Sequence, residues 1–277
     1  MTPTQAVERL VRASVGLSDA DLDRPFAWHE YDEEGLRFAL LVAHHQLRET
    51  TATVAAARLG AGRPYTEALR ILAQFHESYR DLTGALAGTG EDELDAVPSA
   101  GQWPIREVLR HVLEAERGFQ TSMETALEAR RAGRDQVRPD REAFMARRGA
   151  AEDPSGSRAD ALNALYRSHV AVLGGLADVT DPELDTPSYF WETEAFPIRF
   201  RMHRLEEHLR QHTIQVDKTL VAIGHPPTEA ERLVRNIYTG LAALESVTSG
   251  VEVRGDLVTQ CAAAVSDLAQ QLEDAMR

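Results

Sequence analysis

The sequence predicts an all-α protein built from two related four-helix bundles. Apolar residues recur at three- and four-residue spacing along most of the chain, which is typical of amphipathic helices. The chain also resembles itself after a shift of 162 residues. From Asp19 to Arg70 this shift gives 17 identities in 52 positions without a gap, where unrelated sequences of average composition would share roughly 3 or 4. We interpret the match as an internal duplication.

Eight helices are expected, over residues 5–17, 35–60, 66–88, 104–131, 158–178, 197–223, 228–248 and 253–276. Pro104 and Pro197 stand where a helix tolerates proline in its first turn. Thr66 and Thr228 are each followed by Glu, a combination that favours a helix start. Residues 130–157 are charged and carry glycine and proline, so they should form a long connection with at most one short helix. A connection of this length could border a functional site.

The repeat predicts how the helices divide into domains. It pairs 5–17 with 158–178, 35–60 with 197–223 and 66–88 with 228–248, which leaves 253–276 to match 104–131. Residues 64–227 then form one complete bundle. Residues 1–63 and 228–277 form a second bundle in circularly permuted order, because its helices come from both ends of the chain. This second bundle closes either within one chain or through a domain-swapped dimer.

Composition narrows the class of partner. The 277 residues carry a net charge of -14, which repels a phosphate backbone. Apolar runs stop far short of the roughly 20 residues that cross a bilayer, and the amino terminus lacks the pattern of a signal peptide. Cys261 is the single cysteine, which suits a reducing compartment. We therefore expect a cytoplasmic protein that acts on a small molecule, without membrane or nucleic-acid partners. Whether it forms a homodimer is not decided by the sequence.

Three histidines are the candidates for chemistry. In the helix 197–223, His212 occupies the position of the apolar seam between Leu209 and Val216, and His208 lies one turn earlier, about 40° away around the helix. Two histidines four residues apart offer a metal two ligands from one helix. His111, in the helix 104–131, could supply a third. The alternative is buried histidines that hydrogen-bond to carboxylates.

The segments around these histidines resemble a known family. The pattern W-P-I-x-E-V-L-x-H-V-L-x-A-E from Trp103 to Glu116 is followed about a hundred residues later by E-H-L-R-Q-H-T-I-Q, from Glu207 to Gln215. This combination is similar to the DinB-like superfamily, which includes YfiT-like metal-dependent hydrolases, thiol-dependent S-transferases and maleylpyruvate isomerases. The resemblance covers roughly residues 63–226.

The resemblance implies a fold and a set of ligands. The family fold is a four-helix bundle with a metal held by one histidine of the second helix and two residues four apart on the fourth. These roles fall on His111, His208 and His212, with Gln215 at the glutamine that usually follows the last histidine.

The other copy departs from this pattern. Gln46 and Thr50 replace His208 and His212, and matching 253–276 to 104–131 by eye puts Thr259 opposite His111. The terminal bundle is therefore expected to lack the metal site and to serve packing, dimerisation or pocket shape. A separate cluster of His29, His44 and His45 is a weaker alternative. Cys261 is expected to be a buried structural thiol.

A metal on three neutral imidazoles keeps an open coordination position, as catalytic zinc sites do. Zinc or nickel there would activate water for hydrolysis or a low-molecular-weight thiol for S-transfer. Glu107, Glu207 and Gln215 are candidates for orienting a ligand imidazole, and either acid for acting as base. Trp103 is expected to anchor a helix in the core, and His203 to lie outside the ligand set.

Two other functions remain as alternatives. The first is a non-catalytic binding or dimerisation module whose metal site is a relic, since one copy of the scaffold does without the histidines. The second is a role in DNA metabolism, suggested by the origin of the family name. The net charge of -14 argues against direct contact with DNA.

Overall fold

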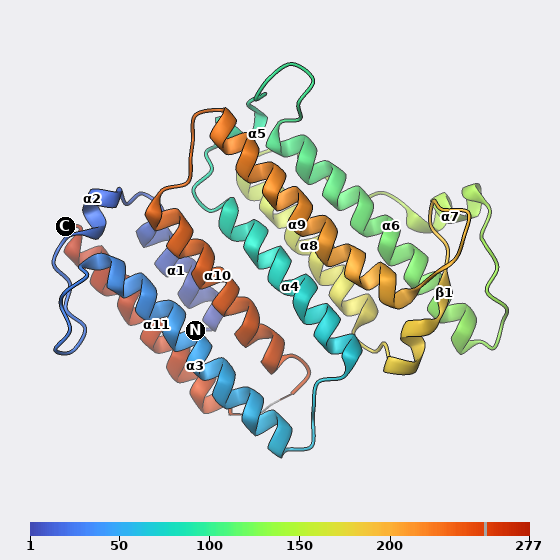
Figure 1. The fold of residues 1–277 in the computed structure, drawn as a ribbon, viewed down its shortest axis with the longest axis horizontal. Coiled ribbons are helices and arrows are strands. Elements are labelled where there is room, and N and C mark those ends of the chain that lie inside the picture. The colour runs from blue at the N-terminus through green and yellow to red at the C-terminus, as the bar shows by residue number, and fades with distance from the viewer. Residues whose placement is uncertain (252–253) are drawn as a thin grey trace. The chain divides into compact units, whose positions relative to one another are not determined.

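A computed structural model describes residues 1–251 and 254–277, whose regular secondary structure is almost entirely helical (Figure 1). The predicted all-α class is confirmed. The α-helices are α1 Pro3–Ser14, α2 Asp19–Leu22, α3 Leu36–Gly60, α4 Glu67–Ala85, α5 Glu91–Asp95, α6 Ile105–Arg131, α7 Arg141–Arg148, α8 Arg158–Leu176, α9 Ile198–Ala222, α10 Glu229–Thr248 and α11 Gly255–Ala275. A 3-10 helix, η1 (Asp181–Asp185), precedes a small antiparallel hairpin of β1 (Pro187–Ser188) and β2 (Phe196–Pro197).

The eight long helices lie where the periodicity predicts them, with ends that differ by at most about three residues. The predicted start of the last helix at residue 253 lies outside the described residues. Thr228 caps α10 by accepting the backbone N–H of Glu231, whereas Pro104 and Pro197 stand one position before the first helical residue rather than on it. None of the described helices combines the length and apolar character that a membrane crossing requires.

The chain divides into two compact units. Unit 1 comprises Met1–Pro64, Arg80–Thr89 and His225–Arg277, and unit 2 comprises Tyr65–Tyr79 and Gly90–Gly224. The repeat placed the whole of residues 66–88 in one bundle, but the end of α4 groups with unit 1. In that unit Arg80 forms an ion pair with Glu245, and Asp81 one with Arg235. Sequence periodicity alone could not reveal these contacts.

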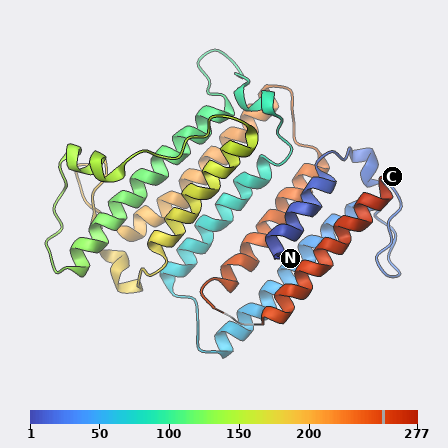
Figure 2. The same cartoon turned by 180° about the vertical axis from the view of Figure 1, so that it is seen from behind.

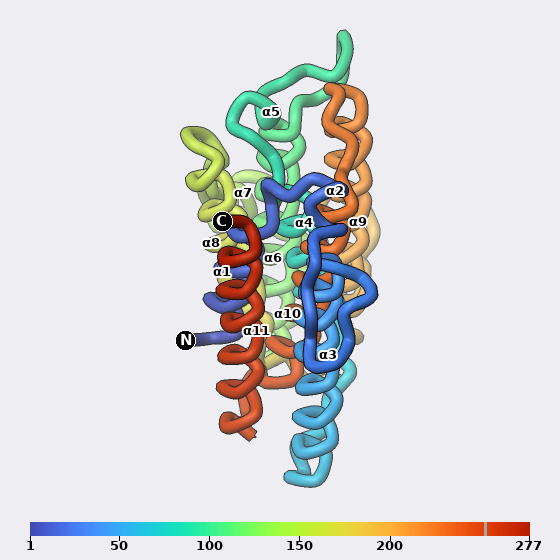
Figure 3. The backbone as a smooth tube through the Cα atoms, turned by 90° about the vertical axis from the view of Figure 1, so that its left-hand side faces the viewer, coloured from blue at the N-terminus to red at the C-terminus, as the bar shows by residue number. Residues whose placement is uncertain are grey.

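Unit 1 is a bundle of α1, α3, α10 and α11, in which the two terminal helices lie side by side (Figure 2). Arg9 of α1 pairs with Glu273 of α11 at 2.9 Å and donates to Ser266. Helix α3 packs against both α10 and α11, and α3 runs lengthwise beside α11 (Figure 3). In the described residues, helices from both ends of the chain thus pack together in this bundle.

Unit 2 contains α6, α8, α9 and the first part of α4. Helix α6 packs against α8 and α9 through fully buried residues that include Val108, Leu109 and Val112. The first part of α4 joins α9 through an ion pair between Glu67 and Arg199. A contact between His76 and His169, with ring nitrogens 2.8 Å apart, joins α4 to α8. Four helices thus enclose one apolar core.

Each unit contains the same arrangement of ion pairs. In unit 1, Arg37 of α3 pairs with Asp23 at 3.1 Å and with Glu229 at 2.5 Å. In unit 2, the residues related to these by a shift of 162, namely Arg199, Asp185 and Glu67, form the equivalent pairs. In both units the arginine and aspartate come from one repeat and the glutamate from the other.

Candidate metal centre

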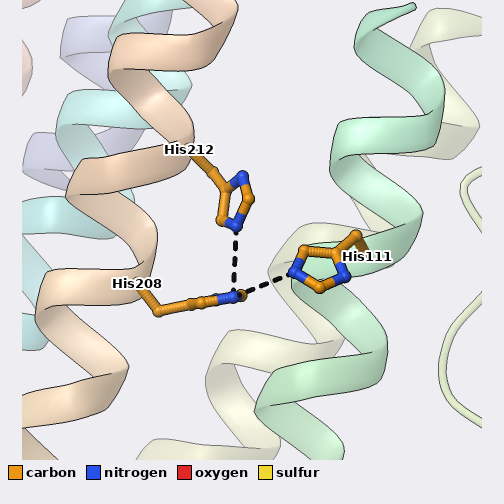
Figure 4. A group of neighbouring side chains, drawn as sticks. All are labelled: His111, His208 and His212. Atoms are coloured by element: carbon orange, nitrogen blue, oxygen red, sulfur yellow. Dashed lines mark hydrogen bonds between the residues drawn. The ribbon is translucent and has the colours of Figure 1, made fainter. Parts of the chain in front are cut away.

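Two helices of unit 2 carry the candidate ligands, His208 and His212 on α9 and His111 on α6. The apolar seam of α9 faces the core, so the two histidines on that seam are buried, with 6% and 5% of their surface exposed. His111 lies beside the fully buried Val112 and is half-buried. The packing of α6 on α9 therefore brings the three imidazoles together (Figure 4).

The three rings converge through their ring nitrogens. His208 Nε2 lies 3.2 Å from His111 Nε2 and 3.1 Å from His212 Nε2, and one nitrogen from each ring lies within 4.8 Å of the others. Imidazole nitrogens at about 2.0–2.1 Å from one tetrahedral cation would be roughly 3.3 Å apart. The two shortest separations are close to this value, so a divalent cation fits the donor set.

The contacts of the other ring nitrogens support this fit. Gln215 Oε1 lies 2.9 Å from His212 Nδ1. Because an amide oxygen only accepts, Nδ1 must carry the proton, which leaves the Nε2 lone pair directed at the other two rings. Within the described part of the chain, buried His208 Nδ1 has no hydrogen-bond partner. The alternative of histidines paired with carboxylates is not what the structure shows.

Burial keeps the two imidazoles of α9 neutral. It lowers the pKa of His208 to about 3, with smaller effects from the neighbouring His212 and His111. Burial also lowers the pKa of His212, although its hydrogen bond to Gln215 acts in the opposite direction. Neutral imidazoles are the form that binds metal.

The donor set is that of an open site. Across residues 1–251 and 254–277, these three histidines are the one group of acidic, histidine or cysteine side chains placed to hold a metal. Structural zinc sites normally use four protein ligands, whereas catalytic sites use three and leave a position for a reacting molecule. The arrangement therefore has room for an exogenous ligand.

A cavity of about 670 Å³ opens beside the histidines. Its wall is largely aromatic and apolar, formed by Trp103, Phe119, Phe144, Met145, Phe190 and Trp191. Trp103 was expected to anchor a helix in the core. Instead it is 45% exposed, lines the cavity and lies with its ring centroid 5.3 Å from that of His111. Its position just before α6 puts it at the mouth of the site rather than inside the bundle.

Two segments that the periodicity did not assign to the site supply four of these six residues. Phe144 and Met145 come from α7, the short helix of the long connection, which therefore borders the site as expected. Phe190 and Trp191 come from the loop between β1 and β2. Two adjacent large aromatic residues in this loop are the sequence feature that could have drawn attention to it. The sequence does not show, however, that they would line the cavity beside the histidines.

The hairpin loop is held by a fully buried arginine. Arg201 of α9 forms two contacts of 2.7 Å with Glu192, and its guanidinium carbon lies 6.0 Å from the Phe190 ring centroid and 5.9 Å from that of Trp191. Gly118 of α6 makes room for Phe190, because a Cβ there would come within 2.2 Å of the ring. Both residues thus fix the aromatic wall.

The two acidic candidates lie elsewhere. Glu107 pairs with Arg110, and Glu207 pairs with Arg204 at 3.2 Å; both carboxylates are exposed. Within the described residues neither contacts an imidazole of the group, so the expectation that they orient a ligand is not supported. Each carboxylate pairs instead with an arginine three residues away on its own helix, although Glu107 is one turn from His111 and Glu207 is next to His208. Gln215 does contact the group. His203 is half-buried and does not line the cavity.

Unit 1 has no equivalent donor set in its described part. The Cys261 thiol contacts the Gln46 carbonyl at 3.6 Å and hydrogen-bonds to Thr50. Thr259, matched by eye to His111, is exposed and bonds to the Gly255 carbonyl, so that match is wrong. Burial raises the pKa of Cys261, as in an unreactive structural thiol. His29, His44 and His45 form no metal-binding group among the described residues.

Comparison with known proteins agrees with this geometry. The family model of the DinB superfamily matches residues 74–216, just over half of the chain, and the match contains all three histidines. No curated protein and no solved structure matches the sequence. The all-α bundle, the three converging imidazoles and the family match lead to one conclusion: the chain belongs to the DinB superfamily.

Proposed function

We propose that the protein is a metal-dependent enzyme in which His111, His208 and His212 bind a divalent cation, zinc or nickel, and that its substrate is a small molecule. One observation carries the proposal: three imidazoles from two helices direct their nitrogens at one point, and that point borders an open cavity. Imidazole nitrogen suits both metals. A three-ligand site facing a cavity is typical of catalysis.

When bound, the cation would act as a Lewis acid that favours the deprotonated form of a water or a small thiol. The chain supplies the rest of the site. Gln215 holds the proton on Nδ1 of His212 and thereby fixes the ring. The largely apolar wall lowers the polarity beside the histidines, which strengthens electrostatic interactions there. Among the described residues that line the cavity, Glu114 has the single carboxylate, and it is exposed enough to exchange protons with solvent.

Two reaction types follow from this arrangement. An activated water would hydrolyse a bond of the substrate, and an activated low-molecular-weight thiol would be the nucleophile of an S-transfer. The apolar wall accommodates the carbon skeleton of either kind of substrate. The net charge of -14 supports a small-molecule substrate over a nucleic acid.

We also propose that unit 1 is a duplicated and permuted copy that has lost the site. The matched ion pairs of Arg37 and Arg199 support the duplication. The contact of Cys261 with Gln46 and Thr50 supports the loss, because these two positions correspond to His208 and His212. In the natural protein, unit 1 then contributes stability rather than a second reaction.

Metal analysis of purified, untagged protein by mass spectrometry tests the function. We expect about one zinc or nickel per chain, and a rise in melting temperature when metal is returned to stripped protein. His212→Ala should remove the metal while the protein stays folded. His203→Ala is the matched control, a histidine on the same helix outside the cavity, and should keep the metal.

The same variants separate an enzyme from a binding module with a relic site. Far less than one metal per chain, with no effect of added metal on melting, would overturn the proposal. In that case His212→Ala should lower stability by roughly 1–3 kcal/mol, as expected for a buried histidine that only packs, without any change in metal content. If the protein does bind metal, activity screens with ester, amide and thiol-acceptor substrates are carried out on the metal-loaded form.

A further inference from the structure

We propose that the cavity selects substrates that combine an apolar ring with an anionic group, and that Arg148 binds the anion. The inference deepens the proposed function and rests on it for the reaction, but the binding preference itself does not need the metal. Arg148 is the last residue of α7 and lines the same cavity as the three histidines. The aromatic wall and this arginine therefore face one bound molecule.

The apolar part of the preference comes from the wall. Phe119 lies with its ring centroid 5.2 Å from that of Phe190 and 5.7 Å from that of Trp191, and Phe144 lies 5.6 Å from Phe190. These rings come from three separate segments of unit 2 and meet at the cavity. Phe119 meets Phe190 and Trp191 edge to face, and an apolar ring of a ligand can pack against aromatic side chains in the same ways. A volume of about 670 Å³ is that of a small-molecule site.

The anionic part comes from the contacts of Arg148. Its backbone carbonyl accepts from Arg117 Nε at 2.7 Å, and its Nη2 donates to the Glu114 carbonyl at 3.2 Å. These contacts place the half-buried guanidinium about one helical turn along α6 from His111. Within the described residues no carboxylate forms an ion pair with it. A planar guanidinium with free donors binds carboxylates and phosphates well.

The other charges around the cavity do not replace Arg148. Arg204 also lines the cavity, but its charge is offset by its ion pair with Glu207. Glu114 is exposed at the rim, and Arg148 contacts its backbone carbonyl rather than its carboxylate. Among the described lining residues, the two arginines outnumber the single carboxylate of Glu114 by one, and of these arginines Arg204 has its charge offset by an ion pair. An anion would meet one guanidinium whose charge is not already paired.

Two probes of the same skeleton test this selection, 4-phenylbutanoate and its neutral counterpart 4-phenylbutanamide. Binding is followed by the fluorescence of the chain's tryptophans, because Trp103 and Trp191 line the cavity. The titrations use the full chain stripped of metal, so that a carboxylate cannot bind the cation instead of Arg148. We expect the carboxylate to bind about tenfold more tightly than the amide.

Arg148→Gln should remove this difference by weakening the carboxylate alone. Arg147→Gln is the matched control, since Arg147 is the neighbouring arginine of α7 but pairs with Glu128 outside the cavity. It should keep the tenfold preference. Thermal melting of each variant checks that it is folded.

Three results would overturn the inference: equal affinities for the two probes, an unchanged preference in Arg148→Gln, or no saturable binding of either probe. Each is independent of metal content. A chain that binds the carboxylate through Arg148 but never binds metal would refute the proposed enzyme and leave the anion site intact. A chain that binds metal but shows no preference for the carboxylate would refute the anion site and leave the proposed enzyme intact.

Discussion

His212 Nδ1 lies 2.9 Å from Gln215 Oε1, and this contact sets the orientation of the imidazole at the centre of the site. Both residues lie on α9, three positions apart, so one turn of helix holds them together. The amide oxygen accepts the Nδ1 proton and leaves Nε2 as the nitrogen that faces His208 at 3.1 Å. Gln215 therefore acts on the site without belonging to its donor set.

Gln215→Leu tests this contact. The variant removes the acceptor and leaves a slightly shorter apolar side chain, so metal affinity should fall by about 10- to 100-fold while the fold is retained. A competition titration against a chelator measures the affinity. Gln211→Leu, the same substitution one turn earlier where no hydrogen bond to an imidazole is present, should change the affinity little. Equal losses in the two variants would show that Gln215 has no special role.

Glu116 of α6 makes stability depend on pH. This carboxyl is 2% exposed, and burial raises its pKa to about 7 although a hydrogen bond from Ser168 at 2.8 Å acts in the opposite direction. The folded state then retains a proton that the unfolded chain releases near its ordinary value of 4.5. The stability that this group contributes is complete below pH 4.5 and is lost as the pH rises through about 7.

Glu116→Gln should abolish this loss. The amide stays neutral and can still accept from Ser168, so the variant should gain roughly 3 kcal/mol on wild type between pH 4.5 and pH 8. Urea unfolding at a series of pH values gives the difference. The comparison with wild type is needed because the lowered pKa values of His208 and His212 change stability in the opposite direction below pH 6.5. A constant difference at all pH values would contradict the assignment.

Glu192 compensates the buried charge of Arg201. The guanidinium is fully buried and sits among aromatic rings of the hairpin and α9. Glu192→Gln would leave that charge unpaired and should destabilise the fold by about 3 kcal/mol. Glu207→Gln breaks an exposed pair with Arg204 and should change stability by less than about 1 kcal/mol. Chemical denaturation measures both. A small effect of Glu192→Gln would mean that the rings suffice to hold the arginine.

Gly118 leaves the space that Phe190 occupies. In Gly118→Ala the new Cβ would lie 2.2 Å from the ring, so Phe190 must move and the hairpin loop must shift. The net loss of stability should be about 1–3 kcal/mol, with metal content unchanged. Gly174→Ala on α8 meets no atom within 4 Å and should instead stabilise by up to about 1 kcal/mol through helix propensity. Opposite signs in thermal melting are the expected outcome; a stabilised Gly118→Ala would contradict it.

The long helices could be predicted because their signals are local. The apolar seam of α9 predicted both the helix and the inward position of His212, and the four-residue spacing placed His208 beside it. His111 could be added because the family pattern surrounds it. The short elements α2, α5 and η1 gave no usable periodicity, since four or five residues complete barely one turn.

The expectations that failed depended on contacts between distant segments. Matching the last helix by eye selected Thr259, whereas packing of α11 on α3 brings Cys261 to Gln46. The acidic candidates were chosen by sequence distance from a histidine, but Glu107 and Glu207 face arginines on their own helices at the surface. A one-residue change in helical phase moves a side chain by about 100°. Position along the chain therefore could not fix these contacts.

By itself the sequence determined the all-α class, the repeat of 162 residues and the three histidines, because helical periodicity and residue spacing are properties of a single segment. The tertiary structure decided which remote side chains surround those histidines. It brought α7 and the hairpin loop to the cavity, set Trp103 at its mouth and left Arg148 facing inward without a carboxylate partner in the described chain. These features arise from packing between segments far apart in the chain, which only the folded molecule specifies.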